Sequence, residues 1–373
     1  MIAASTLLRE IGSDFYTGVP DSLLRSFYDE IVRTYGLDPA HHVIAANEGN
    51  AVGIAAGYHL ATGKVPVIYL QNSGIGNTIN PLASLMNPKV YGIPCILIVG
   101  WRGEPGVHDE PQHAYQGEVT CRLLEDMGIE YSVIGQETSQ EAVRDEMHRF
   151  RELLSRGEDV AFVIRKGAIS GDRESYGNSY TITREDAIRR ILAASGDDPI
   201  ICTTGKAGRE LYELREKDGA GHGRDFLSVG SMGHASSIAL GVALKKPEST
   251  VWCIDGDGAV LMHMGAMAVI GKAHPGNLLH ILLNNESHES VGGLPTAADA
   301  VNLTEVAKAC GYAGSASVKN DEELERELSG IRRQQMPYLL EIRCSTASRS
   351  DLGRPKESPA ENKKAFMSAL GGR

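Results

Sequence analysis

Cysteine is scarce in this sequence, and none of the six residues lies in a CxxC pair. Closely paired cysteines are typical of zinc sites, and a dense cysteine pattern in a short secreted chain is typical of a disulfide framework. The spacing of the cysteines therefore argues against a zinc site and against a disulfide framework. We expect buried thiols at Cys95, Cys121, Cys202, Cys253, Cys310 and Cys344.

Long apolar runs are also missing, since none approaches the roughly 20 residues that a membrane helix needs. The fractions of 42% hydrophobic and 23% charged residues are those of a soluble globular protein. The amino-terminal segment carries Arg9, Glu10 and Asp14 in an amphipathic pattern and has no basic stretch leading an apolar core. It therefore does not predict a signal peptide, and we expect a cytoplasmic protein.

The sequence has no excess of basic residues. Its 48 acidic and 37 basic residues give a formal net charge of -11. Such a charge repels nucleic acid and anionic lipid, so we expect neither as a partner. An anionic substrate would have to be captured by a local site.

Short apolar runs of strand type alternate with longer helical patterns from end to end, which predicts parallel α/β sheets. At 373 residues the chain exceeds what one hydrophobic core usually serves, so we expect two domains. The predicted strands are HVIAA, VPVIYL, CILIVG, VAFVI, PIICTT, STVWCI, LLHILL and YLLEI.

A polar segment rich in Gly and Ser lies between Lys166 and Thr183 and has no apolar periodicity. It predicts domains at 1–168 and 183–373 joined by a linker at 169–182. The two halves also show a faint repeat at a spacing of 184 residues, which aligns 54–74 with 238–258. Chance similarity between two buried helix-strand units is a serious alternative. The repeat is thus only supporting evidence for duplicated domains.

The most informative motif is Gly256, Asp257 and Gly258, which follows one predicted strand, while Asn285 follows the next. Strands joined by one right-handed crossover usually lie side by side, about 4.8 Å apart, with their carboxyl ends on the same edge. The carboxylate and amide can then reach one ion, and with a carbonyl and phosphate oxygens they form a hard ligand set for Mg²⁺. We expect the two glycines to allow a sharp turn and a close approach to a phosphate.

Three further positions attract attention at predicted strand-to-helix junctions. A Glu in a first helical turn, like Glu48, needs no functional reason, because the helix dipole favours it there by about 0.3 to 1 kcal/mol. Met232 lies opposite Glu48 in the repeat alignment, and a Met before a helix of small residues is ordinary packing. The segment from Thr203 to Lys206 ends a strand and opens a helix, so it could receive phosphate oxygens. It is not a Walker motif, because Ile200 stands where that motif needs Gly.

The GDG tripeptide, its spacer and the NN pair resemble the diphosphate and metal motif of thiamine diphosphate enzymes. The resemblance implies that Mg²⁺ is bound by the side chains of Asp257 and Asn285 and by the carbonyl of Ser287. It implies that Glu48 bonds N1′ of the aminopyrimidine and favours its imino tautomer, and that Met232 enforces the V shape of the cofactor. The cofactor-binding residues that it implies are Thr204, Gly205, Ser231, Met232, Gly256, Asp257, Gly258, Ala259, Asn285 and Ser287.

Four further segments sharpen the resemblance: YLQNSGIGNTINPLASL, WRGEPGVHDEPQH, NESHESVGGLPT and SPAENKKAFM. They are similar to the phosphonopyruvate decarboxylase family, with sulfopyruvate decarboxylases as near relatives. This implies an α/β fold of two similar domains, one binding the pyrimidine and one the diphosphate, with no middle domain. It also implies decarboxylation of a 2-oxo acid in phosphonate biosynthesis by a homo-oligomer whose sites are shared between subunits.

The segment WRGEPGVHDEPQH predicts a loop after a strand, where α/β proteins place ligands. His108 and His113 are candidates for catalysis and for binding the substrate anion, but two solvated loop histidines are nearly as good an interpretation. Asn72 and Ser73, in the loop after VIYL, are further candidate substrate ligands. Two more candidates follow the metal motif. His288 and Glu289 are either groups that support the site or residues of a plain surface turn.

Two other functions stay open at this point. A carboligase would consume a second 2-oxo acid in each turnover. A nucleotide-binding or regulatory α/β protein would occupy a Gly-rich site without catalysis, and the coincidence of Glu48 with the GDG and NN motifs argues against it.

Overall fold

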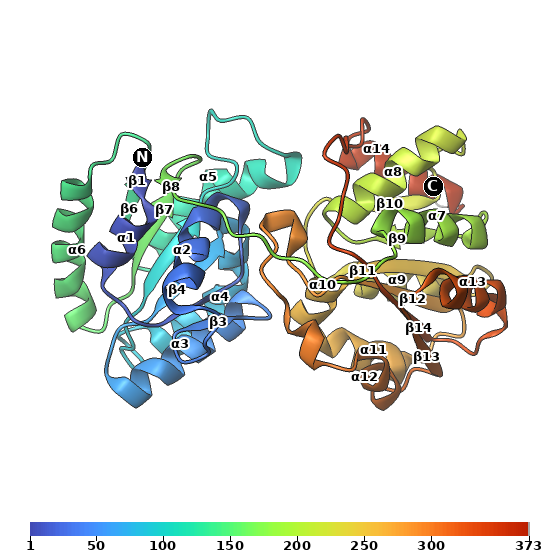
Figure 1. The fold of residues 1–373 in the computed structure, drawn as a ribbon, viewed down its shortest axis with the longest axis horizontal. Helices are drawn as coiled ribbons and strands as arrows, with labels where there is room; N and C mark the ends of the chain where they lie inside the picture. The colour runs from blue at the N-terminus through green and yellow to red at the C-terminus, as the bar shows by residue number, and fades with distance from the viewer. Residues whose placement is uncertain (372–373) are drawn as a thin grey trace. The chain divides into compact units, whose positions relative to one another are not determined.

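The computed structural model describes residues 1–371 and divides the chain into two compact units, Met1–Ser175 and Tyr176 onward (Figure 1). The division falls inside the segment expected as a linker. Both ends of that segment take part in pairing, since Ile169 pairs with Ile2 and Ile182 bridges to Cys344. Within residues 1–371, no helix is long and apolar enough to span a membrane.

The first unit is built on a six-stranded sheet in the order β3-β2-β4-β5-β7-β6, and every pairing is parallel. A two-stranded sheet joins β1 (Ile2–Ala3) to β8 (Ile169–Ser170). The strands of the large sheet are β2 (Tyr16–Gly18), β3 (His42–Ile44), β4 (Val67–Gln71), β5 (Ile96–Gly100), β6 (Glu130–Ile134) and β7 (Val160–Ile164). The helices are α1 (Ala4–Ile11), α2 (Arg25–Tyr35), α3 (Glu48–Thr62), α4 (Ile75–Pro81), α5 (Pro111–Asp126) and α6 (Gln140–Ser155).

The second unit has a six-stranded parallel sheet in the order β10-β9-β11-β12-β14-β13. Its strands are β9 (Ile200–Cys202), β10 (Asp225–Leu227), β11 (Val251–Gly256), β12 (Leu278–Asn284), β13 (Gly314–Val318) and β14 (Tyr338–Arg343). Its helices are α7 (Arg184–Ser195), α8 (Lys206–Asp218), α9 (Ala235–Lys245), α10 (Asp257–Met262), α11 (Gly265–Ala273), α12 (Leu303–Ala309), α13 (Asp321–Gly330) and α14 (Pro359–Ala369).

The two sheets have the same topology. Numbered along each unit, the strands follow the order 2-1-3-4-6-5 in both cases. The third strands, β4 and β11, begin at Val67 and Val251, which are the positions that a shift of 184 residues superimposes. The expectation of two similar parallel-sheet domains is therefore confirmed.

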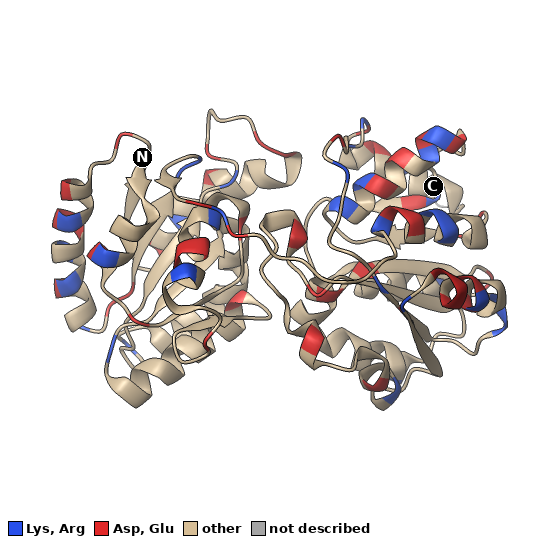
Figure 2. Ribbon diagram, in the orientation of Figure 1, with Lys and Arg blue, Asp and Glu red and all other residues tan. Residues whose placement is uncertain are grey.

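Helices cover both faces of the second sheet (Figure 1). One core cluster joins the sheet to α7, α8 and α13, and includes Ile188, Leu211 and Leu324. The other joins it to α9, α11 and α12, and includes Ala239 and Ile270. Because each face is buried, the central strands are nearly continuous apolar runs, as parallel sheets require. Charged residues are frequent on the helices, and α6 and α8 carry both signs interspersed (Figure 2).

Candidate active site

The carboxyl edge of the second sheet brings together the two predicted metal ligands. The strands β11 and β12 are parallel neighbours with Gly256 opposite Leu283, so Asp257 and Asn285 follow adjacent strand ends. The carboxylate of Asp257 is 3% exposed and accepts a 2.5 Å hydrogen bond from the hydroxyl of Thr296. The spatial pairing expected from the right-handed crossover is present.

Burial of the Asp257 carboxylate is unfavourable for its charge. Loss of water raises its pKa to about 6, although the Thr296 hydroxyl and the backbone amides of Asp257, Asn285 and Gly258 oppose that rise. These neighbours are a hydroxyl and amides, which carry dipoles but no net charge. A cation at this edge would therefore offset the cost of the buried carboxylate.

The chain passes from strand to helix within the motif, without a left-handed glycine. Gly256 has φ -112° and ends β11, and α10 begins directly at Asp257. A close approach does occur at Gly258, where an added Cβ would lie 3.2 Å from Cε of Met232 and 3.3 Å from Cε1 of His288. The motif is a strand-to-helix junction that packs against both side chains, and a larger residue at 258 would press on both of them.

His288 is buried, so its interpretation as part of a plain surface turn is wrong. It is 9% exposed, and burial lowers its pKa to about 4. The imidazole is thus neutral near pH 7. Ser231, next to Met232, has φ 54°, a left-handed conformation that non-glycine residues rarely adopt.

The segment 203–206 opens α8 as expected. Gly205, with φ 99°, occupies the N-cap position of that helix. The hydroxyl of Thr204 donates to the carbonyl of Val229, and Lys206 donates from Nζ to Glu289 at 2.8 Å. Ala259 is buried in the first turn of α10. The first backbone amides of α8 receive no hydrogen bond from a capping side chain, because the N-cap residue Gly205 has no side chain.

In the first unit, Glu48 is the first residue of α3 and directly follows the N-cap residue Asn47. It is 6% exposed, and Oε2 accepts a 2.7 Å hydrogen bond from Nδ2 of Asn77. Burial raises its pKa, with the Asn77 contact opposing the rise. Gly74 leaves room for the carboxylate, because a Cβ there would lie 2.3 Å from Oε1.

The Asn72 amide is already occupied by the protein, which corrects its expected role as a direct substrate ligand. It is 1% exposed, donates to the carbonyl of Arg102 and to Thr120, and accepts from the amide of Arg102. Ser73 is exposed and donates to the side chain of Gln71 at 2.7 Å. Asn72 thus holds the backbone of the loop after β5, and Ser73 is the better placed of the pair to meet a ligand.

The expected histidine loop is shorter than predicted. Because Pro111 is favourable at a helix start, α5 begins there and His113 lies in its first turn. His113 is 9% exposed, and burial, with help from the charge of Arg102, lowers its pKa to about 4. His108 is exposed in the remaining loop. Only His108 fits the alternative of a solvated loop histidine.

Two charged residues near these side chains escaped the sequence analysis. Asp21 follows β2, is fully buried, accepts a 2.6 Å hydrogen bond from Gln71 and has a pKa raised by burial. Arg102 follows β5 and pairs with Asp109. Its Nε donates to Oδ2 at 2.7 Å, and its Nη2 donates to Oδ1 at 2.5 Å. Their position just after strand ends was the available signal, since ligands bind there in α/β sheets.

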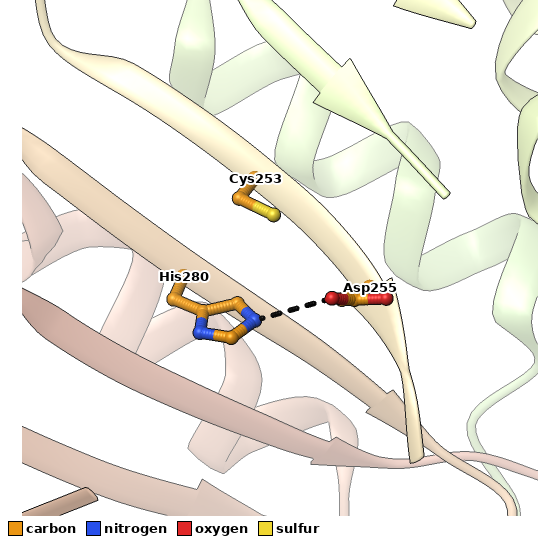
Figure 3. Close-up of side chains that lie close together, drawn as sticks. All are labelled: Cys253, Asp255 and His280. Carbon is orange, nitrogen blue, oxygen red and sulfur yellow. Dashed lines mark ion pairs between the residues drawn. The ribbon is translucent and has the colours of Figure 1, made fainter. Parts of the chain in front are cut away.

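Three buried side chains of β11 and β12 lie close together before the GDG junction (Figure 3). Atoms of Cys253, Asp255 and His280 that could bind a metal lie within 4.8 Å of one another, and His280 Nε2 is 3.6 Å from Asp255 Oδ2. The other oxygen of Asp255 accepts from the amide of Gly256 at 3.0 Å. We interpret the group as internal support for Gly256. The expectation of six buried thiols is wrong for Cys121 and Cys310, which are partly exposed.

Comparison with known proteins decides the family. The phosphonopyruvate decarboxylases of Streptomyces viridochromogenes and Streptomyces hygroscopicus are 36% and 35% identical to this chain. Each alignment covers 98% of the chain, and 94% and 93% of the respective relative. The chain belongs to the phosphonopyruvate decarboxylase family. It is therefore a thiamine diphosphate-dependent decarboxylase, a carboxy-lyase.

Family models agree with this assignment in both units of the decarboxylase. Residues 3–124 match the N-terminal TPP binding domain of thiamine pyrophosphate enzymes, and residues 205–342 match the C-terminal TPP binding domain. A sulfopyruvate decarboxylase of Methanosarcina acetivorans is 28% identical over 85% of this chain and 84% of its own length. The two matched domains leave no middle domain between them.

The residues of this decarboxylase fit a magnesium diphosphate group. The uncompensated carboxylate of Asp257 and the amide oxygen of Asn285 are hard oxygen donors on one sheet edge. The amide-rich start of α8 is suited to phosphate oxygens. In the other unit, the buried carboxyl of Glu48 suits a ring nitrogen that needs a proton donor.

Proposed function

We propose that the protein decarboxylates 3-phosphonopyruvate to phosphonoacetaldehyde and CO₂, with Mg²⁺ and thiamine diphosphate, in phosphonate biosynthesis. The identity to two phosphonopyruvate decarboxylases over nearly the whole chain carries the proposal. The buried carboxylate of Asp257 beside Asn285 supports Mg²⁺ as the metal. When bound, thiamine diphosphate supplies a nucleophilic carbon and accepts the electrons released as CO₂ departs.

The chain's own groups hold and activate the cofactor. Asp257, Asn285 and the carbonyl of Ser287 bind the Mg²⁺ that neutralises the diphosphate. Glu48, whose raised pKa lets its carboxyl keep a proton, donates that proton in a hydrogen bond to N1′ of the aminopyrimidine. Met232, packed on Gly258, supports the bent conformation of the cofactor.

The substrate anion is met by residues at the carboxyl edge of the first sheet. We assign its recognition to Ser73, His108 and His113, with Asn72 holding the loop that carries Arg102. Since His113 is neutral near pH 7, it contributes a hydrogen bond rather than a positive charge. Arg102 is the fixed cation of this group, and its pairing with Asp109 orients it.

One observation favours a shared site. Glu48 lies in the first unit and Asp257 in the second, and the proposed function requires both residues at one cofactor. We propose that they come from different subunits of a homo-oligomer, at least a dimer with equivalent sites.

An aldehyde assay with three substrates tests the function. Wild-type protein with Mg²⁺ and thiamine diphosphate should release an aldehyde from phosphonopyruvate at a higher kcat/KM than from sulfopyruvate or pyruvate. A preference for sulfopyruvate would favour the second candidate, sulfopyruvate decarboxylation, which the 28% identical relative supports. Consumption of two 2-oxo acids per CO₂-releasing cycle would favour carboligation instead.

A further inference from the structure

The amide of Asn285 has a fixed orientation in this structure. Its Oδ1 accepts a 3.1 Å hydrogen bond from the amide of Ser287, and its Nδ2 donates to Glu289 Oε2 at 3.2 Å. A carboxylate can only accept, so it can face the nitrogen of this amide but not the oxygen. Glu289 thus decides which end of the Asn285 side chain is left for another ligand.

Glu289 is itself held by two cations. Its side chain is 10% exposed, forms an ion pair with Nη1 of Arg184 and accepts from Nζ of Lys206 at 2.8 Å. Arg184 is fixed in turn by Glu210, through contacts of 2.6 and 2.8 Å. Ser348 accepts a further hydrogen bond from Lys206 at 2.7 Å.

These contacts connect three segments that are distant in sequence. Arg184 is the first residue of α7, Lys206 is the first residue of α8, and Glu289 opens the short helical turn Glu289–Val291 after the metal loop. The loop after β14 joins them through Ser348. The carboxylate of Glu289 is the point where both cations and the Asn285 amide meet.

We propose that Glu289 is a positioning residue for the metal, which turns the amide of Asn285 so that Oδ1 is presented to the cation. The inference rests on the proposed function, because it requires a cation bound by Asp257 and Asn285. Glu289 touches the ligand and not the reacting atoms. Its loss should therefore weaken metal binding while leaving kcat at saturating metal nearly unchanged.

The test is a Mn²⁺ titration of the protein with thiamine diphosphate in excess. Electron paramagnetic resonance measures the free Mn²⁺ at each step. Mn²⁺ takes the same oxygen ligands as Mg²⁺ and reports free and bound ion directly. Removing a partner that orients a metal ligand typically costs about 10- to 100-fold in affinity. We expect a loss of that size in Glu289→Ala and a smaller one in Glu289→Gln, which keeps one acceptor oxygen.

Glu286→Gln is the matched control. Glu286 lies in the same loop and pairs with Arg343 and Tyr180 instead of Asn285. Its Mn²⁺ affinity should stay within about twofold of wild type. The melting temperature of each variant without metal reports any damage to the loop.

Each outcome decides the inference. Wild-type Mn²⁺ affinity in Glu289→Ala, or an equal loss in Glu286→Gln, overturns it. If Glu289→Ala does not fold, Glu289→Gln decides in the same way. Failure of the wild-type protein to bind Mn²⁺ with the cofactor would contradict the proposed function instead.

Discussion

At the scale of single residues, burial shifts the pKa values of five titratable groups near the two sheet edges. Loss of water raises the pKa values of Asp21, Glu48 and Asp257, and it lowers those of His113 and His288 to about 4. The carboxyls can therefore keep a proton at a higher pH than usual, and both imidazoles are neutral near pH 7. These states suit proton donation at Glu48 and charge compensation by a cation at Asp257.

Glu48→Gln should bind thiamine diphosphate with Mg²⁺ but exchange the C2 proton of the cofactor more slowly. A neutral amide cannot donate and regain the proton that a carboxyl shares with N1′, and such proton handling contributes about 10²- to 10⁴-fold. Acid-quenched NMR of the bound cofactor in D₂O measures the exchange rate. Glu137→Gln, at a carboxylate 73% exposed in the same unit, is the control. Unchanged exchange in Glu48→Gln would remove Glu48 from the mechanism.

The contribution of His113 to the KM for phosphonopyruvate should not change between pH 5.5 and 7.5, because its imidazole stays neutral over this range. Its pKa of about 4 lies below the ordinary value, so the protonated form is lost as pH rises through 4 and is already absent above 5.5. The ratio of KM in His113→Gln to KM in wild type should thus be constant over this range. A ratio that changes with a midpoint near 6.5 would show that His113 titrates there.

The paired substitutions His108→Ala and His113→Ala separate recognition from chemistry. A charge-assisted hydrogen bond contributes about 1.5 to 3 kcal/mol, which corresponds to roughly ten- to more than a hundredfold in affinity. A residue that recognises the phosphonate should lose kcat/KM for phosphonopyruvate by this factor while its weaker turnover of pyruvate persists. Equal losses on both substrates would assign that residue to the common chemistry.

The sequence predicted the pairing of Asp257 with Asn285, because one right-handed crossover makes their strands neighbours. It did not predict Asp21, since its partner Gln71 comes close only once β2 and β4 lie together. It did not predict Arg102 either, although its partner Asp109 lies seven residues away in the same loop.

At the scale of elements, each strand run predicted from apolar composition overlaps an observed strand. Three of the strands that were not predicted, β6, β10 and β13, are edge strands. The outer strands β6 and β13 are mostly partly exposed, so their sequences lack the continuous apolar character of buried parallel strands. The inner strand β2 escaped because its residues, Tyr16–Gly18, form no apolar run. The start of α5 at Pro111 was missed because the loop composition around it masked the helix.

Gly74→Ala should disturb Glu48 without touching the metal edge. The added Cβ would lie 2.3 Å from Oε1 of Glu48, so the carboxyl must move from its contact with Asn77. We expect slower C2 exchange and a kcat reduced by about tenfold or more, within the range of lost proton handling. Gly76→Ala, where an added Cβ meets nothing within 4 Å, should behave as wild type. Equal rates in the two variants would contradict the placement of Glu48.

At the scale of the whole molecule, two units of the same topology carry different chemistry at corresponding places. The shift of 184 residues that superimposes β4 and β11 also puts Glu48 opposite Met232. One unit thus supplies a carboxyl where the other supplies an apolar side chain. Under the proposed function, units of the same topology thus contribute different side chains to cofactor binding.

Sharing of sites between subunits predicts complementation. Chains with Glu48→Gln and chains with Asp257→Ala should each be inactive alone, but a mixed dimer has one site with both substitutions and one with neither. Random pairing of equal amounts then restores about one quarter of wild-type activity in a dimer. Co-expression with two affinity tags measures this. No activity in the purified mixed dimer would mean that each site is built from one chain.

The central claim is that Asp257 and Asn285 form the Mg²⁺ site that holds thiamine diphosphate, and calorimetry of cofactor binding tests it most directly. Wild-type protein should bind thiamine diphosphate tightly with Mg²⁺ and weakly after chelation of the metal. Asp257→Ala should lose at least about 1.5 to 3 kcal/mol of that binding, a factor of roughly ten to more than one hundred. Asp299→Ala, at an exposed carboxylate of the same unit, should bind as wild type. Wild-type affinity in Asp257→Ala with Mg²⁺ present would contradict the account.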